Sequence, residues 1–212
     1  MKKLVILVFV TLFSISAHSA LPNIPTDCFD SGFYCSKSST KTVNGQKTIE
    51  VQFFATLVAE NFNGHEEIID KFTDFSRWTD YTDGADEINM VSSRTVSSRV
   101  LAGRRVMTQY ARYFMNAPWP VNRMEIIEQS IYKELPEVSG TVTAWSFETD
   151  KDFSLQGVKR KNGTLYLSYD EEKKEYVVRV VMEVVPDTSF FKIASKYISA
   201  GITRLFLGMF EL

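Results

Sequence analysis

The chain has 212 residues, of which 44% are hydrophobic and 13% aromatic, and its formal net charge is −2 at pH 7. A chain of about this length is usually one domain with a real hydrophobic core, and a mildly acidic balance gives no electrostatic case for nucleic acid as a partner. Sixteen Phe and nine Tyr are a heavy aromatic load, which has to line an interior.

The first twenty residues predict a secretory signal peptide. Lys2 and Lys3 form a positive start, "LVILVFVTLF" an apolar core and "SISAHSA" an end of mostly small residues, and the core is too short to span a bilayer. Cleavage is expected after Ser19 or Ala20. Lys plus Arg then falls from 24 to 22 against 26 Asp plus Glu, so the net charge becomes −4. We therefore expect a soluble protein that is periplasmic or secreted.

Residues 21–44 are polar and rich in turn formers, and we interpret them as an extension before a domain of residues 45–212. Cys28 and Cys35 are the only cysteines, and in an oxidising compartment their spacing around a glycine predicts a local disulfide. A redox pair would need a spacing nearer to C-x-x-C. An open alternative function is a protein-interaction module whose contact surface is this "CFDSGFYC" loop.

The domain begins with a hairpin signal at Asn44–Gly45 and a β-branched, aromatic strand at 47–59. Residues 64–81 then switch to helical spacing, with Ile68 and Phe72 on one side, and predict two short helices. Alternation predicts six further strands, at residues 87–97, 104–115, 122–133, 141–149, 164–169 and 175–185, with tight connections at 161–163 and 170–174.

Residues 186–188 stop the last strand and supply an N-cap for a long helix that reaches the end of the chain. Its apolar stripe comprises Phe190, Ala194, Tyr197, Ile198, Gly201 and Leu205. A large antiparallel sheet must curl, and one long amphipathic helix is the natural cover for its concave side. The order predicts an α+β fold, a curved antiparallel sheet wrapped round a long C-terminal helix.

Three stretches carry a resemblance to a known superfamily: "DFSRWTDYTDGADEINMVSS" (74–93), "APWPVNRMEII" (117–127) and "VVPDTSFFKIASKYISAGITRLF" (184–206). The second is similar to the Pro-aromatic-Pro corner of StAR-related lipid-transfer (START) domains, and the residues that match are Pro118, Trp119, Pro120 and Arg123. Met124 stands where START proteins usually have Asp, and the third stretch lacks the usual Gly-Gly and second Pro. The resemblance covers residues 45–212.

This resemblance implies the helix-grip fold, with a cavity between the sheet and the final helix that binds a lipid or another apolar small molecule. It implies a lipid carrier whose final helix moves to admit lipid or touches a membrane transiently. The same superfamily holds polyketide cyclases and aromatases, which is the alternative function. We expect a monomer without a cofactor.

For the cavity wall we favour Tyr110, Arg112 and Phe114, because this parity of their strand holds the bulkier aromatic pair. The alternative is that Arg112 lies on the outer face and pairs with a carboxylate such as Glu128. The other candidates share apolar faces with the predicted core, so core packing is their alternative role: Trp145, Phe147, Val180, Met182, Tyr197, Ile198 and Ile202. Alternation predicts that the Val180 and Met182 face points inward.

The sequence offers little for catalysis. The mature chain has one histidine, His65, which cannot build the usual His-rich metal site, and no serine sits in a nucleophile elbow. We therefore expect neither a metal site nor an enzyme. A cyclase-like enzyme would instead need a polar cluster facing the cavity, for instance Arg112 with Glu125 or Glu128.

Overall fold

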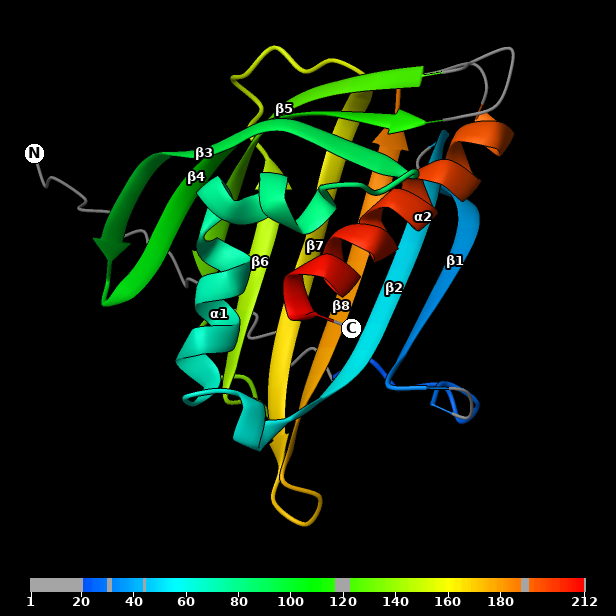
Figure 1. Ribbon diagram of the computed structural model, residues 1–212. Helices are drawn as coiled ribbons and strands as arrows, with labels where there is room; N and C mark the ends of the chain where they lie inside the picture. Colours follow the sequence, from blue (N-terminus) through cyan, green and yellow to red (C-terminus); the bar gives the residue numbers. More distant parts are fainter. Residues whose placement is uncertain (1–20, 30–31, 44, 117–122, 188–190, 212) are drawn as a thin grey trace, which may run out of the picture.

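The computed structural model describes residues 21–29, 32–43, 45–116, 123–187 and 191–211 (Figure 1). The predicted signal peptide, the Pro-Trp-Pro corner, Thr188 and Phe190 therefore lie outside the described residues. The same holds for the side chain of Ala194.

Eight strands form one antiparallel sheet in the order β1-β2-β8-β7-β6-β5-β4-β3. Their bounds are β1 (Tyr34–Val43), β2 (Gln46–Val58), β3 (Ile88–Leu101), β4 (Arg104–Asn116), β5 (Arg123–Glu134), β6 (Thr143–Thr149), β7 (Val158–Asp170) and β8 (Glu175–Pro186). The helical segments are η1 (Ala59–Asn61), α1 (His65–Thr73), η2 (Phe75–Thr82) and α2 (Phe191–Phe210).

The sheet curves around α2, and α1 and η2 lie on the same concave side (Figure 1). The final helix contacts η2, α1 and four strands, namely β1, β2, β3 and β4. This arrangement confirms the predicted α+β fold of a curved sheet around a C-terminal helix. No helix among the described residues is long and apolar enough to cross a membrane.

Strand alternation decides which residues form the core. In β8 the predicted inward face is confirmed, because Val178, Val180, Met182 and Val184 are buried while Arg179 and its neighbours of the same parity are only partly so. In α1 the side chains that recur at helical spacing, Ile68 and Phe72, are also buried, as predicted.

The N-terminal segment differs from its prediction, because residues 34–43 form β1, an edge strand of the sheet. Val43 pairs with Gln46, so β1 and β2 form a hairpin, and Gly45 between them has a positive φ. β1 is short of hydrophobic residues and mostly exposed, as is common for an edge strand, so its sequence shows no alternating apolar pattern. The boundary predicted before residue 45 therefore does not separate residues 34–43 from the sheet.

β7 also differs from its prediction, since it begins at Val158 and residues 161–163 lie inside it. Gly163 is not a turn residue there. It pairs with Phe147, and a Cβ on Gly163 would lie 2.5 Å from Phe147 Cζ and 2.6 Å from the Val181 carbonyl oxygen. The glycine is required by close packing against an aromatic ring rather than by a turn.

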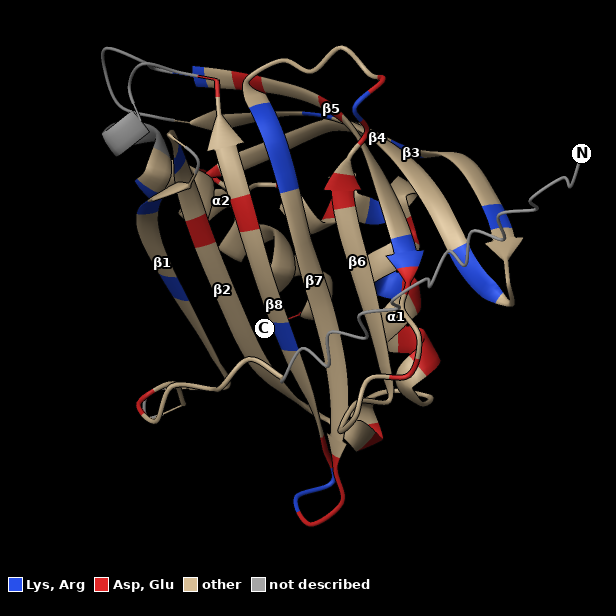
Figure 2. Cartoon of the chain, turned by 180° about the vertical axis from the view of Figure 1, so that it is seen from behind, with Lys and Arg blue, Asp and Glu red and all other residues tan. Residues whose placement is uncertain are grey.

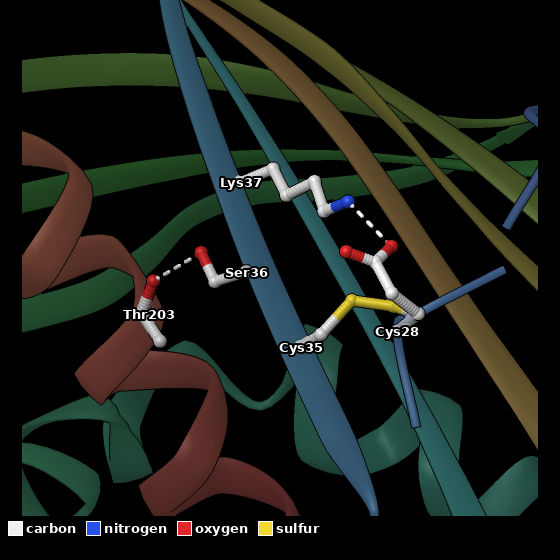
Figure 3. The surroundings of a disulfide bond; sticks show 6 residues. Cys28, Cys35, Ser36, Lys37 and Thr203 are labelled. Atoms are coloured by element: carbon white, nitrogen blue, oxygen red, sulfur yellow. Dashed lines mark hydrogen bonds and ion pairs between the residues drawn. A yellow bond between two sulfur atoms is a disulfide. The ribbon is translucent and has the colours of Figure 1, made fainter. Parts of the chain in front are cut away.

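A disulfide links Cys28 to Cys35, as predicted, with 5.3 Å between their Cα atoms. Figure 3 shows that the two residues after Cys35 connect β1 to α2 and to the segment that precedes β1. Ser36 Oγ and Thr203 Oγ1 of α2 are 2.7 Å apart and share a hydrogen bond. Lys37 forms an ion pair with Asp27 at 2.8 Å.

Candidate ligand-binding site

A cavity of about 30 Å³ lies between the concave face of the sheet, the α1–η2 segment and α2. The helical segments line it with Phe72, Trp78, Ile202, Leu205 and Phe206, and the strands line it with Ile88, Met90, Met115, Phe147 and Met182. This volume holds about two water molecules. Drug-sized ligands occupy about 300–1,000 Å³, so a ligand of that size enters only if a wall of the cavity moves.

Four polar side chains interrupt this apolar wall: Tyr113, Glu128, Tyr132 and Lys161. Glu128 of β5 and Lys161 of β7 form a salt bridge in which their side chains are 2% and 9% exposed. β6 separates these two strands, but its pairing with β5 ends at Ser130 and Thr149. The pair therefore meets just beyond the end of β6, where no strand lies between the two side chains.

Two buried polar atoms at the cavity have no hydrogen-bond partner among the described residues, Glu128 Oε2 and Trp78 Nε1. The first can only accept a hydrogen bond when the carboxylate is ionised, and the second can only donate one. Buried polar groups are nearly always satisfied in folded proteins, so each such atom calls for an explanation. Water or the polar group of a bound molecule would satisfy both.

The two tyrosines add hydroxyl groups to the cavity wall. Burial raises the pKa of Tyr113 well above its usual value, and the negative charge of Glu128 adds to the shift. Burial and then Glu128 do the same for the pKa of Tyr132, so both hydroxyls keep their protons at neutral pH. Tyr132 donates to Gln109 Oε1 at 2.8 Å, and Gln109 Nε2 donates to Ser93 Oγ at 2.8 Å.

Tyr132 is held by a cluster of aromatic rings from the helical segments and β6. Its ring centroid lies 4.7 Å from that of Phe75, 5.5 Å from Phe147 and 5.6 Å from Phe72. Trp78 meets it edge-on at 6.2 Å. Ring contacts of this kind fix side chains in one rotamer, so the polar end of Tyr132 is positioned by the α1–η2 segment.

The prediction for β4 is wrong, because Tyr110, Arg112 and Phe114 lie on the outer face of the sheet. Arg112 pairs with Glu125 at 2.7 Å, and Tyr110 lies under the guanidinium of Arg94. The opposite parity faces inward, with Gln109, Ala111, Tyr113 and Met115 all buried. Aromatic bulk misled the prediction, since rings on the outer face are covered by arginines instead of by the core. The outer-face alternative for Arg112 is confirmed, with Glu125 in place of Glu128.

The other predicted ligand residues divide into two groups. Phe147, Met182 and Ile202 line the cavity. Trp145, Val180 and Ile198 are buried in the core away from it, and Tyr197 is half-buried. Arg105 covers the Trp145 ring at 5.0 Å, which completes the packing of that side chain.

Among the polar residues of the cavity, the sequence pointed to Glu128 alone, as one member of the polar cluster that a cyclase would need, and Tyr113, Tyr132 and Lys161 were not predicted. In β5, Glu128 shares its parity with Ile126, Ser130 and Tyr132, all buried, and an acidic residue within an apolar face was the available signal. Lys161 gave no signal, since the following Asn162–Gly163 resembled a turn.

His65 lies at the start of α1, with Nε2 3.2 Å from Glu66 Oε1. Within the described ranges, no three His, Cys, Asp or Glu side chains are grouped so that they could hold a metal ion.

No protein-family model and no curated protein matches this sequence. Solved structures do match its fold. The protein TTHA0849 from Thermus thermophilus is 14% identical with a TM-score of 0.51, and the match covers 76% of this chain and 94% of that one. The Zhui aromatase/cyclase from a Streptomyces species is 9% identical with a TM-score of 0.46, covering 77% and 90%. A START superfamily protein from Mycobacterium smegmatis is 10% identical with a TM-score of 0.45, covering 76% and 94%.

At these identities the likeness is one of fold. This chain has the helix-grip fold, with an eight-stranded antiparallel sheet and a C-terminal helix packed against it.

Proposed function

We propose that this protein binds a lipid or another apolar small molecule with one polar group, between the sheet and α2. The observation that supports it best is the pair of unsatisfied atoms, Glu128 Oε2 and Trp78 Nε1, in a cavity that is otherwise apolar. Ligand sites in proteins combine such an apolar wall with a few polar groups that orient the guest. The ligand's polar group lies at Glu128 and Lys161, and its apolar part displaces side chains of α2.

The small size of the cavity means that part of the protein has to move when a ligand enters. A long-chain lipid does not fit into about 30 Å³, so uptake requires α2 to shift away from the sheet. A protein that opens and closes in this way can carry its ligand, and we propose carriage without covalent chemistry. The START resemblance of the sequence agrees with this role.

The first experiment identifies a bound molecule. The mature protein is purified without detergent, extracted with organic solvent and examined by mass spectrometry, and a fluorescent fatty acid is titrated into the extracted protein. We expect a co-purified lipid and saturable probe binding. If no lipid is extracted and no probe binds, the proposal is wrong.

The second experiment locates the site with two matched double variants. Glu128→Gln with Lys161→Met removes the buried pair without leaving a lone buried charge. Glu148→Gln with Lys133→Met makes the same changes in an exposed pair that is 2.8 Å apart on the outer face. A hydrogen bond to a charged group contributes about 1.5–3 kcal/mol, so the first variant should bind the probe at least about tenfold more weakly. Equal affinity of the two variants would place the ligand elsewhere.

An enzyme of the cyclase or aromatase kind is the second candidate, because a polar cluster does face the cavity. Lys161, Glu128 and the protonated hydroxyl of Tyr113 are the groups that general acid–base steps on a carbonyl compound would use. The test is to incubate the protein with a poly-β-carbonyl thioester and to follow aromatic absorbance. Formation of an aromatic product that depends on Lys161 favours the enzyme, and unchanged substrate favours the carrier.

We further propose that the chain is exported with loss of residues 1–20. The Cys28–Cys35 disulfide supports this, since disulfides persist in oxidising compartments. N-terminal sequencing of the protein released by osmotic shock from cells expressing the full chain should begin at Ala20 or Leu21. Retention in the cytoplasm with Met1 intact would contradict export.

A further inference from the structure

The β3–β4 hairpin carries a charge opposite to that of the whole chain. Residues 91–116 contain five arginines and no Asp or Glu, although the formal net charge of the chain is −2. Figure 2 shows blue without red along the free end of this hairpin, which projects beyond the rest of the sheet in Figure 1. A local surplus of positive charge on a projecting element favours contact with a negatively charged partner.

Three of these arginines have no acidic partner in the described part of the chain. Arg94, Arg99 and Arg104 are exposed and form no ion pair with any residue of the described ranges. They share the outer face. Arg94 pairs across the strands with Tyr110 and Arg99 with Val106, and Tyr110 and Val106 have the same parity as Arg104 along β4.

The tip of the same hairpin is apolar and exposed. Val100 and Leu101 are 66% and 49% exposed, and they lead into a two-residue turn in which Ala102 and Gly103 both have positive φ. Val96, which lies in β3 four residues before Val100, is 50% exposed. Grouped exposed aliphatic residues on a soluble surface indicate an interaction site.

The edge of β3 does not suit pairing with another strand. Its register shifts between Met90 and Ser92 and again between Thr95 and Ser97, which makes Val91 and Val96 the extra residues of two bulges. Bulges twist an edge away from a partner strand and protect it from edge-to-edge association. The exposed valines therefore face a partner other than an added strand.

We propose that the β3–β4 hairpin docks on an anionic lipid bilayer, with Val100 and Leu101 in the acyl boundary and Arg94, Arg99 and Arg104 on the lipid phosphates. An apolar tip backed by basic residues fits an interface of this kind, where burial of aliphatic side chains and attraction to anionic headgroups add. Nucleic acid is a poorer match, because the tip offers aliphatic side chains and no aromatic platform for bases. This surface lies outside the ligand cavity, so docking is independent of the proposed ligand binding.

Co-sedimentation with vesicles tests the proposal. The mature protein is mixed with vesicles of phosphatidylcholine alone or with one third phosphatidylglycerol, at low and at physiological salt. We expect binding to the anionic vesicles that weakens with salt. Each basic residue near an anionic surface contributes about a factor of five, so Arg99→Gln with Arg104→Gln should weaken binding about 25-fold, and Val100→Ser with Leu101→Ser should also weaken it.

The matched control removes two exposed lysines elsewhere, Lys151→Gln with Lys173→Gln, and should bind vesicles like the unchanged protein. Circular dichroism confirms that each variant is folded. Equal binding to neutral and anionic vesicles, or equal loss in the control, would overturn the proposal. So would displacement from vesicles by a single-stranded oligonucleotide, or a dimer in solution that the tip variant converts to a monomer.

Discussion

At the scale of single residues, Lys161 and Glu128 bring opposite charges into apolar surroundings. Removing a charge from water is costly, and the attraction between the two side chains offsets that cost only while both are present. The intact pair therefore adds little to the free energy of unfolding, but removal of one of the two charges is strongly destabilising. A substitution that keeps the shape and removes one charge leaves the other charge buried without a counter-ion.

Lys161→Met tests this liability. Breaking a buried ion pair costs about 3–5 kcal/mol, and we expect a loss of that size in the free energy of unfolding measured with urea. Lys133→Met removes an exposed lysine from its pair with Glu148 and should cost about 0–1 kcal/mol. If the two variants unfold at the same urea concentration, Lys161 and Glu128 are not an isolated charge pair in solution.

Single side chains were also where the sequence was hardest to interpret. The parity of β4 was ambiguous because both faces carry a tyrosine, Tyr110 outside and Tyr113 inside. The two tyrosines differ in what their rings contact: Tyr110 lies under an arginine of β3, whereas Tyr113 lines the cavity. Alternation divides a strand into two faces, but it does not show which face points inward when both carry aromatic residues.

At the scale of elements, the glycines of α2 set how closely the helix approaches its neighbours. A Cβ on Gly208 would lie 2.0 Å from the carbonyl oxygen of Tyr81 in η2, whereas a Cβ on Gly201 would lie 3.3 Å from Ile88 Cβ and 3.4 Å from Met115 Cε. The first contact is with backbone and cannot yield, while the second is near the limit of ordinary packing. These glycines serve close contact more than helix flexibility.

We predict different outcomes for the same change at the two sites. Gly208→Ala should destabilise the protein by about 1–3 kcal/mol through overpacking, despite the gain of about 1 kcal/mol in helix propensity. Gly201→Ala should stay within about 1 kcal/mol of the unchanged protein, since propensity and crowding offset each other. Thermal unfolding of both variants measures the difference, and equal melting temperatures would show that η2 does not restrain α2.

The edge strand β1 is fastened to the sheet by a charged row on its outer face. Lys41 lies 2.7 Å from both Glu50 of β2 and Glu183 of β8, which are themselves a cross-strand pair of like charge. A row of basic and acidic residues crosses β1, β2 and β8 in Figure 2. Lys41 therefore relieves the repulsion between two carboxylates in addition to attracting each of them.

This row should make stability depend on pH. The hydrogen bond from Lys41 lowers the pKa of Glu183 below its ordinary value of 4.5, and Glu183 with Glu50 raises the pKa of Lys41 above 10.5. The contribution of the row is thus present between these ordinary values; it is lost as pH falls through the lowered pKa of Glu183 and as pH rises through the raised pKa of Lys41. Lys41→Met should cost about 1 kcal/mol in urea unfolding at pH 7 and almost nothing at pH 2. A pH-independent cost would mean that Lys41 acts by packing.

The elements themselves were largely predictable, for physical reasons that differ along the chain. β8 and α1 bury one face against the core, so their periodicity is visible in the sequence. β1 buries little, and its ten residues resemble a polar extension. β7 was predicted too short because Gly163 resembles a turn residue in sequence, and the Phe147 ring and the Val181 carbonyl oxygen on the neighbouring strands explain the glycine.

At the scale of the whole molecule, α2 closes the concave side, and the size of the cavity beneath it implies a second, open arrangement. The Ser36–Thr203 hydrogen bond joins α2 to β1, and Lys71 of α1 forms an ion pair with Glu211 near the end of α2. Each is a single, partly exposed contact and contributes little to stability. They close the molecule without preventing it from opening.

A reversible cross-link tests whether opening is needed for ligand uptake. Ser36→Cys with Thr203→Cys is made in a chain whose Cys28 and Cys35 are serines, so that the new disulfide is the only one. Oxidation should slow uptake of the fluorescent fatty acid at least about tenfold, and reduction should restore it, because the ligand is far larger than the closed cavity. The reduced protein is its own control. Equal rates in both states would mean that the ligand enters by another route.

The strand order also constrains the sequence of events during folding. β2, the most apolar strand near the start of the chain, pairs on one side with β1 and on the other with β8, which begins more than a hundred residues later. Pairing across such a separation is slow to form. During synthesis, which starts at the N-terminus, β1 is available for pairing with β2 long before β8 has been made. The β1–β2 hairpin can therefore form from local residues alone. The polar first strand thus shields one edge of an aggregation-prone segment until the last strand arrives.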